Sequence, residues 1–117
     1  MKQIETKVFG NLDSVCIKLR EVLKGGAIEW IVIVNESEIP DKTLGRFVPQ
    51  KHHDKYEIIK KLTKEDLRSL AVGAERESPV WVVFVTEGDG TSQGAILKQL
   101  PAVHTCYVNV NNWSITL

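Results

Sequence analysis

Two short runs of apolar, largely β-branched residues constrain the fold of this chain more than any other feature. Residues 28–34 read Ile-Glu-Trp-Ile-Val-Ile-Val, and residues 80–85 read Val-Trp-Val-Val-Phe-Val. Runs that are apolar at nearly every position are typical of strands covered on both faces, as in a parallel sheet. Both are far shorter than the roughly 20 residues that a helix needs to cross a bilayer. The sequence therefore predicts two interior strands of one sheet.

The segment ahead of the first run predicts the clearest helix of the chain. Asn11 and Asp13 are suitable helix caps. Gly25-Gly26 is expected to end the helix, because glycine tolerates the left-handed conformation that often follows the last turn. Between these ends the apolar residues recur at helical spacing and predict one buried stripe, formed by Leu12, Val15, Cys16, Leu19, Val22 and Leu23.

Two further helices are expected around the second run. Thr63-Lys64-Glu65-Asp66 resembles a capping box in which aspartate replaces the usual glutamate. The helix that begins at this box is separated from the second apolar run by Pro79. A short helix over 95–100 is expected to stop at Pro101. The apolar face of the first of these helices is expected to comprise Leu67, Leu70, Ala71 and Ala74.

Strands are also expected near both ends of the chain. Residues 2–9 alternate between apolar and charged side chains, which favours a half-exposed strand near a sheet edge. Residues 103–110 predict another strand. Asn111-Asn112 suits a tight hairpin turn into a last strand over 113–117, because asparagine tolerates a positive φ angle.

The middle of the chain is the least regular part. Residues 35–55 contain two prolines and a glycine, and two interpretations stay open: a short strand around Arg46-Phe47-Val48, or a mobile segment. Residues 56–62 fit either a strand or a helical turn, and the pattern leaves both interpretations open.

Together these elements predict one α/β domain over residues 1–117. Its architecture would be a single-domain sandwich of helices on a mixed, partly parallel β-sheet with a C-terminal β-hairpin. Residues 80–110 would form a right-handed parallel βαβ unit. A length of 117 residues and a mass of 13.2 kDa suit one ordinary domain.

Composition narrows the class of protein. Hydrophobic residues make up 43% and charged residues 26% of the chain, close to the average of soluble globular proteins. The 15 basic and 15 acidic residues cancel, which argues against general affinity for nucleic acid but leaves room for a local patch. These values favour an ordinary folded domain over a disordered or fibrous chain.

The start of the chain and the cysteines favour a cytoplasmic location. Met1–Glu5 carries charges where a signal peptide needs an apolar core, so neither export nor membrane insertion is expected. Cys16 and Cys106 lie far apart and lack the spacing of a zinc site, and Cys16 falls on an apolar helix face. Both are therefore expected to remain reduced thiols.

Three segments carry weak signals for chemistry. Residues 86–94 follow a strand and open a helix, where phosphates often bind, but they lack the glycine spacing and the lysine of known nucleotide-binding motifs. His52-His53-Asp54 and His104-x-Cys106 contain metal-ligand residue types without the spacing of a metal motif. The sequence therefore predicts no catalytic residue, no metal ligand and no cofactor.

Charge is unevenly distributed along the chain. From Lys42 to Lys64 there are seven basic and two acidic residues, whereas from Glu65 to Asp89 there are six acidic and two basic residues. Solvated helix faces account for much of this pattern. The functional interpretation is a bipolar surface that recognises a charged macromolecule.

Acidic residues gather after the two interior strands. If these strands run parallel, the segments that follow them emerge at one edge of the sheet, where open α/β folds usually bind ligands. Exposed loops favour acidic residues for solubility as well, and that interpretation stays open. The residues predicted to bind a partner are these carboxylates together with one arginine of the basic segment: Glu36, Glu38, Asp41, Arg46, Glu87 and Asp89.

The leading functional hypothesis is a small cytoplasmic protein-binding module. Within that class, an inhibitor or immunity-type protein that masks the active site of a basic toxin, nuclease or other enzyme fits the size and the segregated charge. The alternative is a metal-dependent phosphoryl-transfer or hydrolytic enzyme that uses the acidic sheet edge, because carboxylate oxygens hold divalent cations. A nucleic-acid accessory protein that uses Lys42–Lys64 ranks third, since Phe47 and Tyr56 are too few for a stacking platform.

Overall fold

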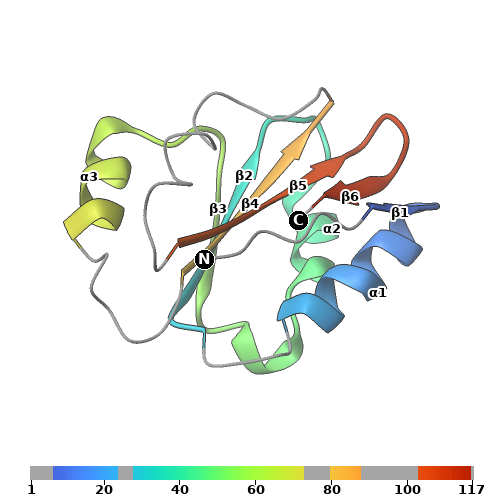
Figure 1. Cartoon of the computed structure of the whole chain (residues 1–117), viewed down its shortest axis with the longest axis horizontal. Coiled ribbons are helices and arrows are strands. Elements are labelled where there is room, and N and C mark those ends of the chain that lie inside the picture. The colour runs from blue at the N-terminus through green and yellow to red at the C-terminus, as the bar shows by residue number, and fades with distance from the viewer. Residues whose placement is uncertain (1–6, 24–27, 73–79, 88–102, 117) are drawn as a thin grey trace.

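The computed structural model describes residues 7–23, 28–72, 80–87 and 103–116, and within them a six-stranded mixed sheet carries helices on both faces (Figure 1). The strand order is β1-β6-β5-β4-β2-β3. The neighbouring strands β5, β4, β2 and β3 are parallel to one another. β6 is antiparallel to both of its neighbours, β5 and β1. Their bounds are β1 (Lys7–Phe9), β2 (Trp30–Asn35), β3 (Tyr56–Ile59), β4 (Val80–Thr86), β5 (Val103–Asn109) and β6 (Ser114–Thr116).

Helical elements cover the two faces unequally. On one face lie α1 (Leu12–Leu23), the short α2 (Asp41–Leu44) and two 3-10 turns, η1 (Gly45–Phe47) and η2 (Gln50–His52). On the other face lies α3 (Lys64–Val72). This arrangement confirms the predicted α/β fold with helices on a mixed, partly parallel sheet and a C-terminal hairpin. Among the described residues no helix is both long enough and apolar enough to cross a membrane.

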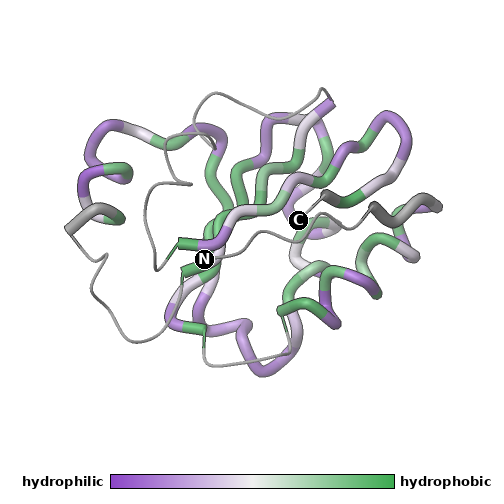
Figure 2. Tube along the Cα trace, in the orientation of Figure 1, coloured by the Kyte–Doolittle hydropathy of each residue, from purple (hydrophilic) through white to green (hydrophobic). Residues whose placement is uncertain are grey.

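The two apolar runs form the adjacent parallel strands β2 and β4, as predicted. Both are hydrophobic along most of their length (Figure 2). Alternate side chains enter two separate cores, which explains why nearly every position is apolar. The core under α1 receives Ile31, Ile33, Val83 and Val85. The core under α3 receives Val32, Val34, Val82 and Phe84.

The two long helices begin at the predicted caps. The Asn11 side-chain oxygen accepts hydrogen bonds from the Ser14 backbone N–H at 3.0 Å and from the Ser14 hydroxyl at 3.2 Å. At α3 the capping box is reciprocal. The Thr63 N–H donates to Asp66 Oδ2 at 2.8 Å, and the Asp66 N–H donates to Thr63 Oγ1 at 3.1 Å. Aspartate therefore replaces glutamate in this box without loss of either bond.

The structure differs from the expectation in two turns. The short strand expected around residues 46–48 is wrong, because Gly45–Phe47 forms a 3-10 turn that places Phe47 and Val48 in the core under α1. The hairpin turn expected at Asn111-Asn112 is present, but neither asparagine has the positive φ angle that was expected there. Four residues separate Asn109 from its partner Ser114, and the positive φ of 47° falls on Trp113. The ambiguous segment after residue 55 is the strand β3.

Several predictions fall outside the described residues. These are the first half of the strand over 2–9, the glycine pair after α1, the end of the second helix, and the segment with the helix over 95–100. The parallel pairing of β4 with β5 confirms the relative direction of the two strands at the ends of residues 80–110.

Candidate functional site

The connections of the parallel strands diverge at β2. From β2 the chain crosses to β3 through α2, η1 and η2 on one face, and from β3 it returns past β2 to β4 through α3 on the other face. In open α/β sheets ligands bind outside the carboxyl ends of the strands where the connections part. In this sheet that point lies between the ends of β2 and β4.

Two of the predicted partner-binding residues lie at this point. Asn35 pairs with Val85 across the ends of β2 and β4, and the Glu36 N–H donates to the Val85 carbonyl at 2.8 Å. Glu87 follows β4, and its carbonyl accepts a hydrogen bond from the Asn111 side chain. Both glutamates are exposed residues at neighbouring strand ends.

The loop after β2 is held by its own polar groups. The Asn35 side-chain oxygen accepts hydrogen bonds from the Ser37 N–H at 3.1 Å and the Ser37 hydroxyl at 2.8 Å. The Asn35 amide donates to the Ile39 carbonyl at 2.8 Å. This turn leaves Glu38 exposed and leads to Asp41 at the start of α2. Asp89 lies outside the described residues.

The carboxyl edge is not uniformly acidic. Lys60 and Lys61 follow β3, which lies beside β2 and runs parallel to it, so two exposed lysines end at the same edge as Glu36. The two interior strands alone do not predict that these lysines lie at this edge. The pattern of residues 56–62 fits either a strand or a helical turn, so the sequence does not show where the segment ends. Burial raises the pKa of the Glu36 carboxyl above its usual range. Burial, and then Cys106 and Glu36, also raise the pKa of Tyr107 on β5.

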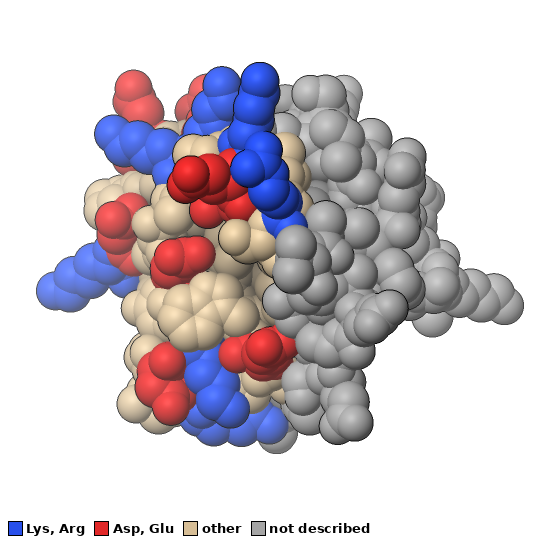
Figure 3. All heavy atoms as spheres, turned by 90° about the vertical axis from the view of Figure 1, so that its left-hand side faces the viewer, with Lys and Arg blue, Asp and Glu red and all other residues tan. Residues whose placement is uncertain are grey.

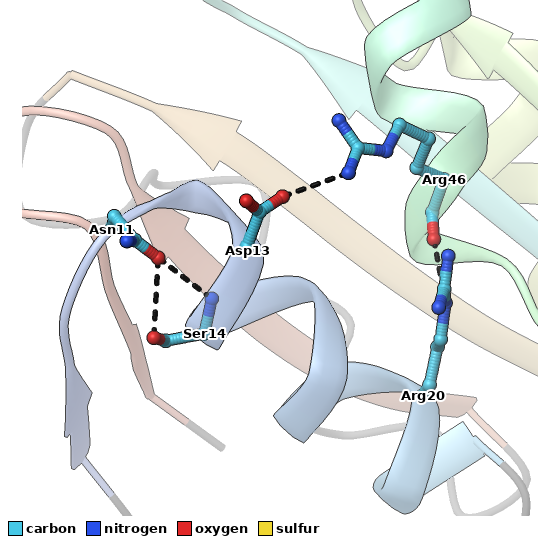
Figure 4. Close-up of polar contacts among 5 residues, drawn as sticks. All are labelled: Asn11, Asp13, Ser14, Arg20 and Arg46. Atoms are coloured by element: carbon cyan, nitrogen blue, oxygen red, sulfur yellow. Dashed lines mark hydrogen bonds and ion pairs between the residues drawn. The ribbon is translucent and has the colours of Figure 1, made fainter.

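Arg46 is not grouped with the acidic edge. Its guanidinium Nη2 lies 2.7 Å from Asp13 Oδ1 in the first turn of α1 (Figure 4). Its backbone carbonyl accepts a hydrogen bond from Arg20 Nε at 2.8 Å. These two contacts join η1 to α1 at both ends of the helix. Arg46 therefore ties two elements of one layer together.

A broad groove of about 760 Å³ lies beside these contacts, between α1 and the segment that joins β2 to β3. Two predicted residues, Asp41 and Arg46, line it. Its apolar surface comes from Ile17, Val48, Pro49 and Tyr56, and its other lining residues are polar or charged: Arg20, Glu21, Lys42, Gly45, Gln50 and His53.

Ile17 distinguishes this groove from the rest of the described surface. Its side chain is 57% exposed, and it is the one large hydrophobic residue exposed in the described part of the chain. Ile17 lies outside the apolar stripe that the sequence predicts for Leu12–Leu23. An apolar residue outside such a stripe is the sequence signal that could have identified Ile17 as exposed. The groove itself joins segments about 30 residues apart, so no local pattern reveals it.

A smaller pocket lies on the other face, under α3. Its volume is about 290 Å³. Apolar side chains form part of its wall, together with carboxylates from β3, from α3 and from the residue before β2. The lining residues are Glu29, Trp30, Val32, Glu57, Leu62, Asp66, Ser69, Leu70 and Val80. On this side of the molecule acidic and basic side chains lie both above and below a patch of uncharged surface (Figure 3).

His104 and Cys106, two of the residues considered as metal ligands, lie within β5. His104 stacks on Trp81 with ring centroids 4.8 Å apart, and burial lowers its pKa. Cys106 is fully buried, and burial raises the pKa of its thiol. Cys16 and Cys106 are both buried free thiols. Within the described ranges, no three histidine, cysteine, aspartate or glutamate side chains come together in a way that could hold a metal ion.

The groove and the pocket are thus two binding-sized hollows on opposite faces of the sheet, and β3 lies between them. Tyr56 of β3 lines the groove, and the next residue, Glu57, lines the pocket. Comparison of the chain with models of protein families, with curated proteins and with solved structures finds no match.

Proposed function

We propose that this chain is a protein-binding module of the inhibitor or immunity type, which masks the active site of a basic toxin, nuclease or other enzyme and does no chemistry of its own. The observation that carries the proposal is the groove between α1 and the β2–β3 connection, with Ile17 exposed at its side. A hollow of this size, lined by apolar side chains together with polar and charged ones, has the mixed composition of a protein interface.

Ile17 supplies the apolar anchor of this interface. A single exposed hydrophobic residue is ordinary on a protein surface, but Ile17 lines a groove together with other apolar residues, so a partner seated in the groove would cover it. Fully burying an isoleucine side chain stabilises by about 1.5–3 kcal/mol, so covering the exposed half of Ile17 contributes roughly half of that amount. A few such buried anchors dominate the binding energy of most interfaces.

The groove wall is ordered before any partner arrives. The Arg46–Asp13 ion pair and the Arg20–Arg46 hydrogen bond hold η1 against α1. On the far wall, the His53 ring nitrogen Nε2 lies 2.9 Å from the Val48 carbonyl oxygen, and the His53 ring contacts Tyr56 edge-on. A wall fixed in this way lowers the entropy cost of binding.

The groove itself is lined by three basic and two acidic side chains, but the loop at its α2 end is acidic and favours a basic surface on the partner there. Asp41 belongs both to the groove and to the acidic loop, in which Glu36 and Glu38 are exposed. A partner seated over the groove would therefore meet carboxylates at its α2 end. Opposite potentials chiefly speed the encounter, whereas the apolar contact with Ile17 would limit dissociation.

The test is a comparison of two Ile17 variants on the purified partner. The partner is first recovered with the tagged chain and identified, and its Kd is then measured by calorimetry. Ile17→Gln removes the apolar contact without adding charge and is expected to weaken binding by about tenfold, as loss of one interface anchor does. Ile17→Leu is the matched control and should retain the wild-type Kd. Equal affinity of wild type and Ile17→Gln would overturn the proposal.

A further inference from the structure

β3 forms one edge of the sheet. Within the described strands it pairs with β2 alone, in parallel register, with Ile31 opposite Tyr56 and Ile33 opposite Ile58. An edge strand presents backbone N–H and C=O groups to any chain that lies beside it in an extended conformation. The edge of β3 is therefore a template on which a further strand can form.

The register identifies the groups that face outward. The Ile31 N–H donates to the Lys55 carbonyl at 2.8 Å, so Lys55 directs its backbone toward β2. In a parallel ladder the residues that bond to the neighbour alternate with residues that point away. The N–H and C=O groups of Tyr56 and Ile58 consequently face away from the sheet.

Successive side chains of β3 border different hollows. Tyr56 lines the groove on the α1 face, and Glu57 lines the pocket on the α3 face. Side chains of an added strand would alternate between the same two faces. A peptide that pairs with Tyr56 and Ile58 can therefore place one side chain beside the groove and the next beside the pocket.

The chemistry of the pocket favours a cationic side chain. Trp30 provides an aromatic ring, and Val32, Leu62, Leu70 and Val80 provide apolar walls. Glu29, Glu57 and Asp66 supply carboxylates, and none of the described residues that line the pocket is lysine or arginine. Arginine and lysine bury their methylene groups along apolar and aromatic surface while their charged ends contact carboxylates.

One of these carboxylates is already fixed in place. Asp66 Oδ2 accepts hydrogen bonds from the Thr63 N–H at 2.8 Å and the Thr63 hydroxyl at 2.9 Å. The capping box of α3 thus holds a carboxylate at the pocket wall. Because the box orders Asp66 before binding, less conformational entropy is lost when a cation arrives.

Charges at the ends of β3 argue against a second copy of this chain as the occupant. Lys55 precedes the strand, and Lys60 and Lys61 follow it. Antiparallel pairing of two copies would bring lysines of one copy beside lysines of the other, which is destabilising. A segment of a different protein avoids this repulsion when its one cation lies at its centre, beside Glu57 and away from the lysines at the strand ends.

We propose that an extended segment of the partner protein adds to the edge of β3 and inserts an arginine or lysine side chain between Trp30, Glu57 and Asp66. This inference rests on the proposed function and names the partner segment that it needs. Backbone bonds to Tyr56 and Ile58 supply affinity, and the pocket supplies the preference for a cation, as in other cases of strand addition.

The probe is a blocked heptapeptide of alternating threonine and valine with arginine at its centre, and its control carries norleucine there. Both are titrated into the isotopically labelled chain and followed by NMR. The arginine peptide should shift the amide signals of Tyr56 and Ile58 and the indole N–H signal of Trp30. It should also bind at least about tenfold tighter than the norleucine peptide, because charge-assisted contacts form only with arginine.

Two variants and one modified peptide complete the test. Glu57→Gln should remove most of the arginine preference, whereas Glu65→Gln, a neutralisation on α3 outside the pocket, should keep it. N-methylation of the peptide backbone should abolish binding. Equal affinity for the two peptides, or no shift at Tyr56 and Ile58 at millimolar peptide, would overturn the inference. Loss of partner binding in Ile17→Gln alongside such a result would leave the proposed function standing and remove only the strand addition.

Discussion

Arg46 and Asp13 lie 33 residues apart in the sequence and form an ion pair of 2.7 Å across the groove wall. Sequence reasoning assigned Arg46 to a partner-binding set because it belongs to a basic segment. The structure adds a local role, since its carbonyl also accepts a bond from Arg20, and Arg46 still lines the groove. What remains available to a partner is the groove that these contacts hold in shape.

The ion pair is expected to add little to global stability. Its two side chains are 56% and 67% exposed, and exposed pairs contribute about 0.2–1 kcal/mol. A double-mutant cycle with Asp13→Asn and Arg46→Gln, measured by urea unfolding, should give a coupling energy in that range that falls as salt rises. A salt-insensitive coupling well above 1 kcal/mol would show that the pair is shielded from solvent.

The sheet carries most of the stability. Ile33 of β2 is fully buried in the core under α1, so Ile33→Ala should lower the free energy of unfolding by about 2–5 kcal/mol. The control is Ile17→Ala, which removes the same atoms from an exposed site and should cost less than about 1 kcal/mol. Denaturant titration of both variants measures their free energies of unfolding. A loss below about 0.5 kcal/mol for Ile33→Ala would contradict an interior position for β2.

Stability should decline in mild acid because of two histidines. Burial lowers the pKa of His52 and of His104 in the folded chain below the ordinary value of 6.5. The unfolded chain then binds more protons near and below that value, so the free energy of unfolding is highest above it and falls as the pH drops through it. Urea unfolding at pH 7.5 and pH 5.5 should show this loss, and His52→Gln/His104→Gln should reduce it. An unchanged pH dependence in the double variant would contradict this assignment.

Both thiols should react only after unfolding. Burial raises the pKa of Cys16 to about 11, and Cys106 is fully buried. Since the thiolate is the reactive form, a thiol reagent at pH 8 should modify neither cysteine in the native chain and both in denaturant. Peptide mapping without reductant should show no bridge between them. Rapid labelling of Cys106 in the native state would mean that β5 is less covered than described.

Much of the fold is predictable because its main elements carry local signals. β2 and β4 are apolar on both faces, and α1 shows a stripe of helical period with an asparagine cap. The segment between β2 and β3 escaped prediction because Leu44, Phe47 and Val48 reach the core from short turns rather than from a periodic element. Such turns leave no repeating pattern.

The candidate site was less predictable, because it is assembled from distant segments. Glu36 and Glu87 lie at neighbouring strand ends because β2 and β4, two recognisable strands, run parallel. The groove depends on α1 packing against residues 41–56, and the pocket depends on α3 packing over Trp30. Tertiary packing of this kind is invisible in the spacing of residues, although Ile17, which falls outside the buried stripe of α1, marks an exposed apolar position in the sequence.

Association with the partner should depend on the acidic loop. Glu38→Lys reverses an exposed charge next to the groove and should slow association severalfold at 0.1 M salt, where the screening length is about 10 Å. Glu65→Lys makes the same charge change on α3 and should slow association less. Stopped-flow or surface-binding kinetics at several salt concentrations measure both. Equal rates for the two variants would remove the loop from the interface.

The most direct test of the account is amide hydrogen exchange of the chain with and without its recovered partner. Binding in the groove predicts added protection in two segments, α1 over residues 12–23 and the connection over residues 41–56. Their exposed turns exchange through local opening that a bound partner suppresses. Protection of both segments, reduced in Ile17→Gln under the same conditions, is the predicted result. Unchanged exchange in both segments, with protection confined to other parts of the chain, would contradict the groove as the binding surface.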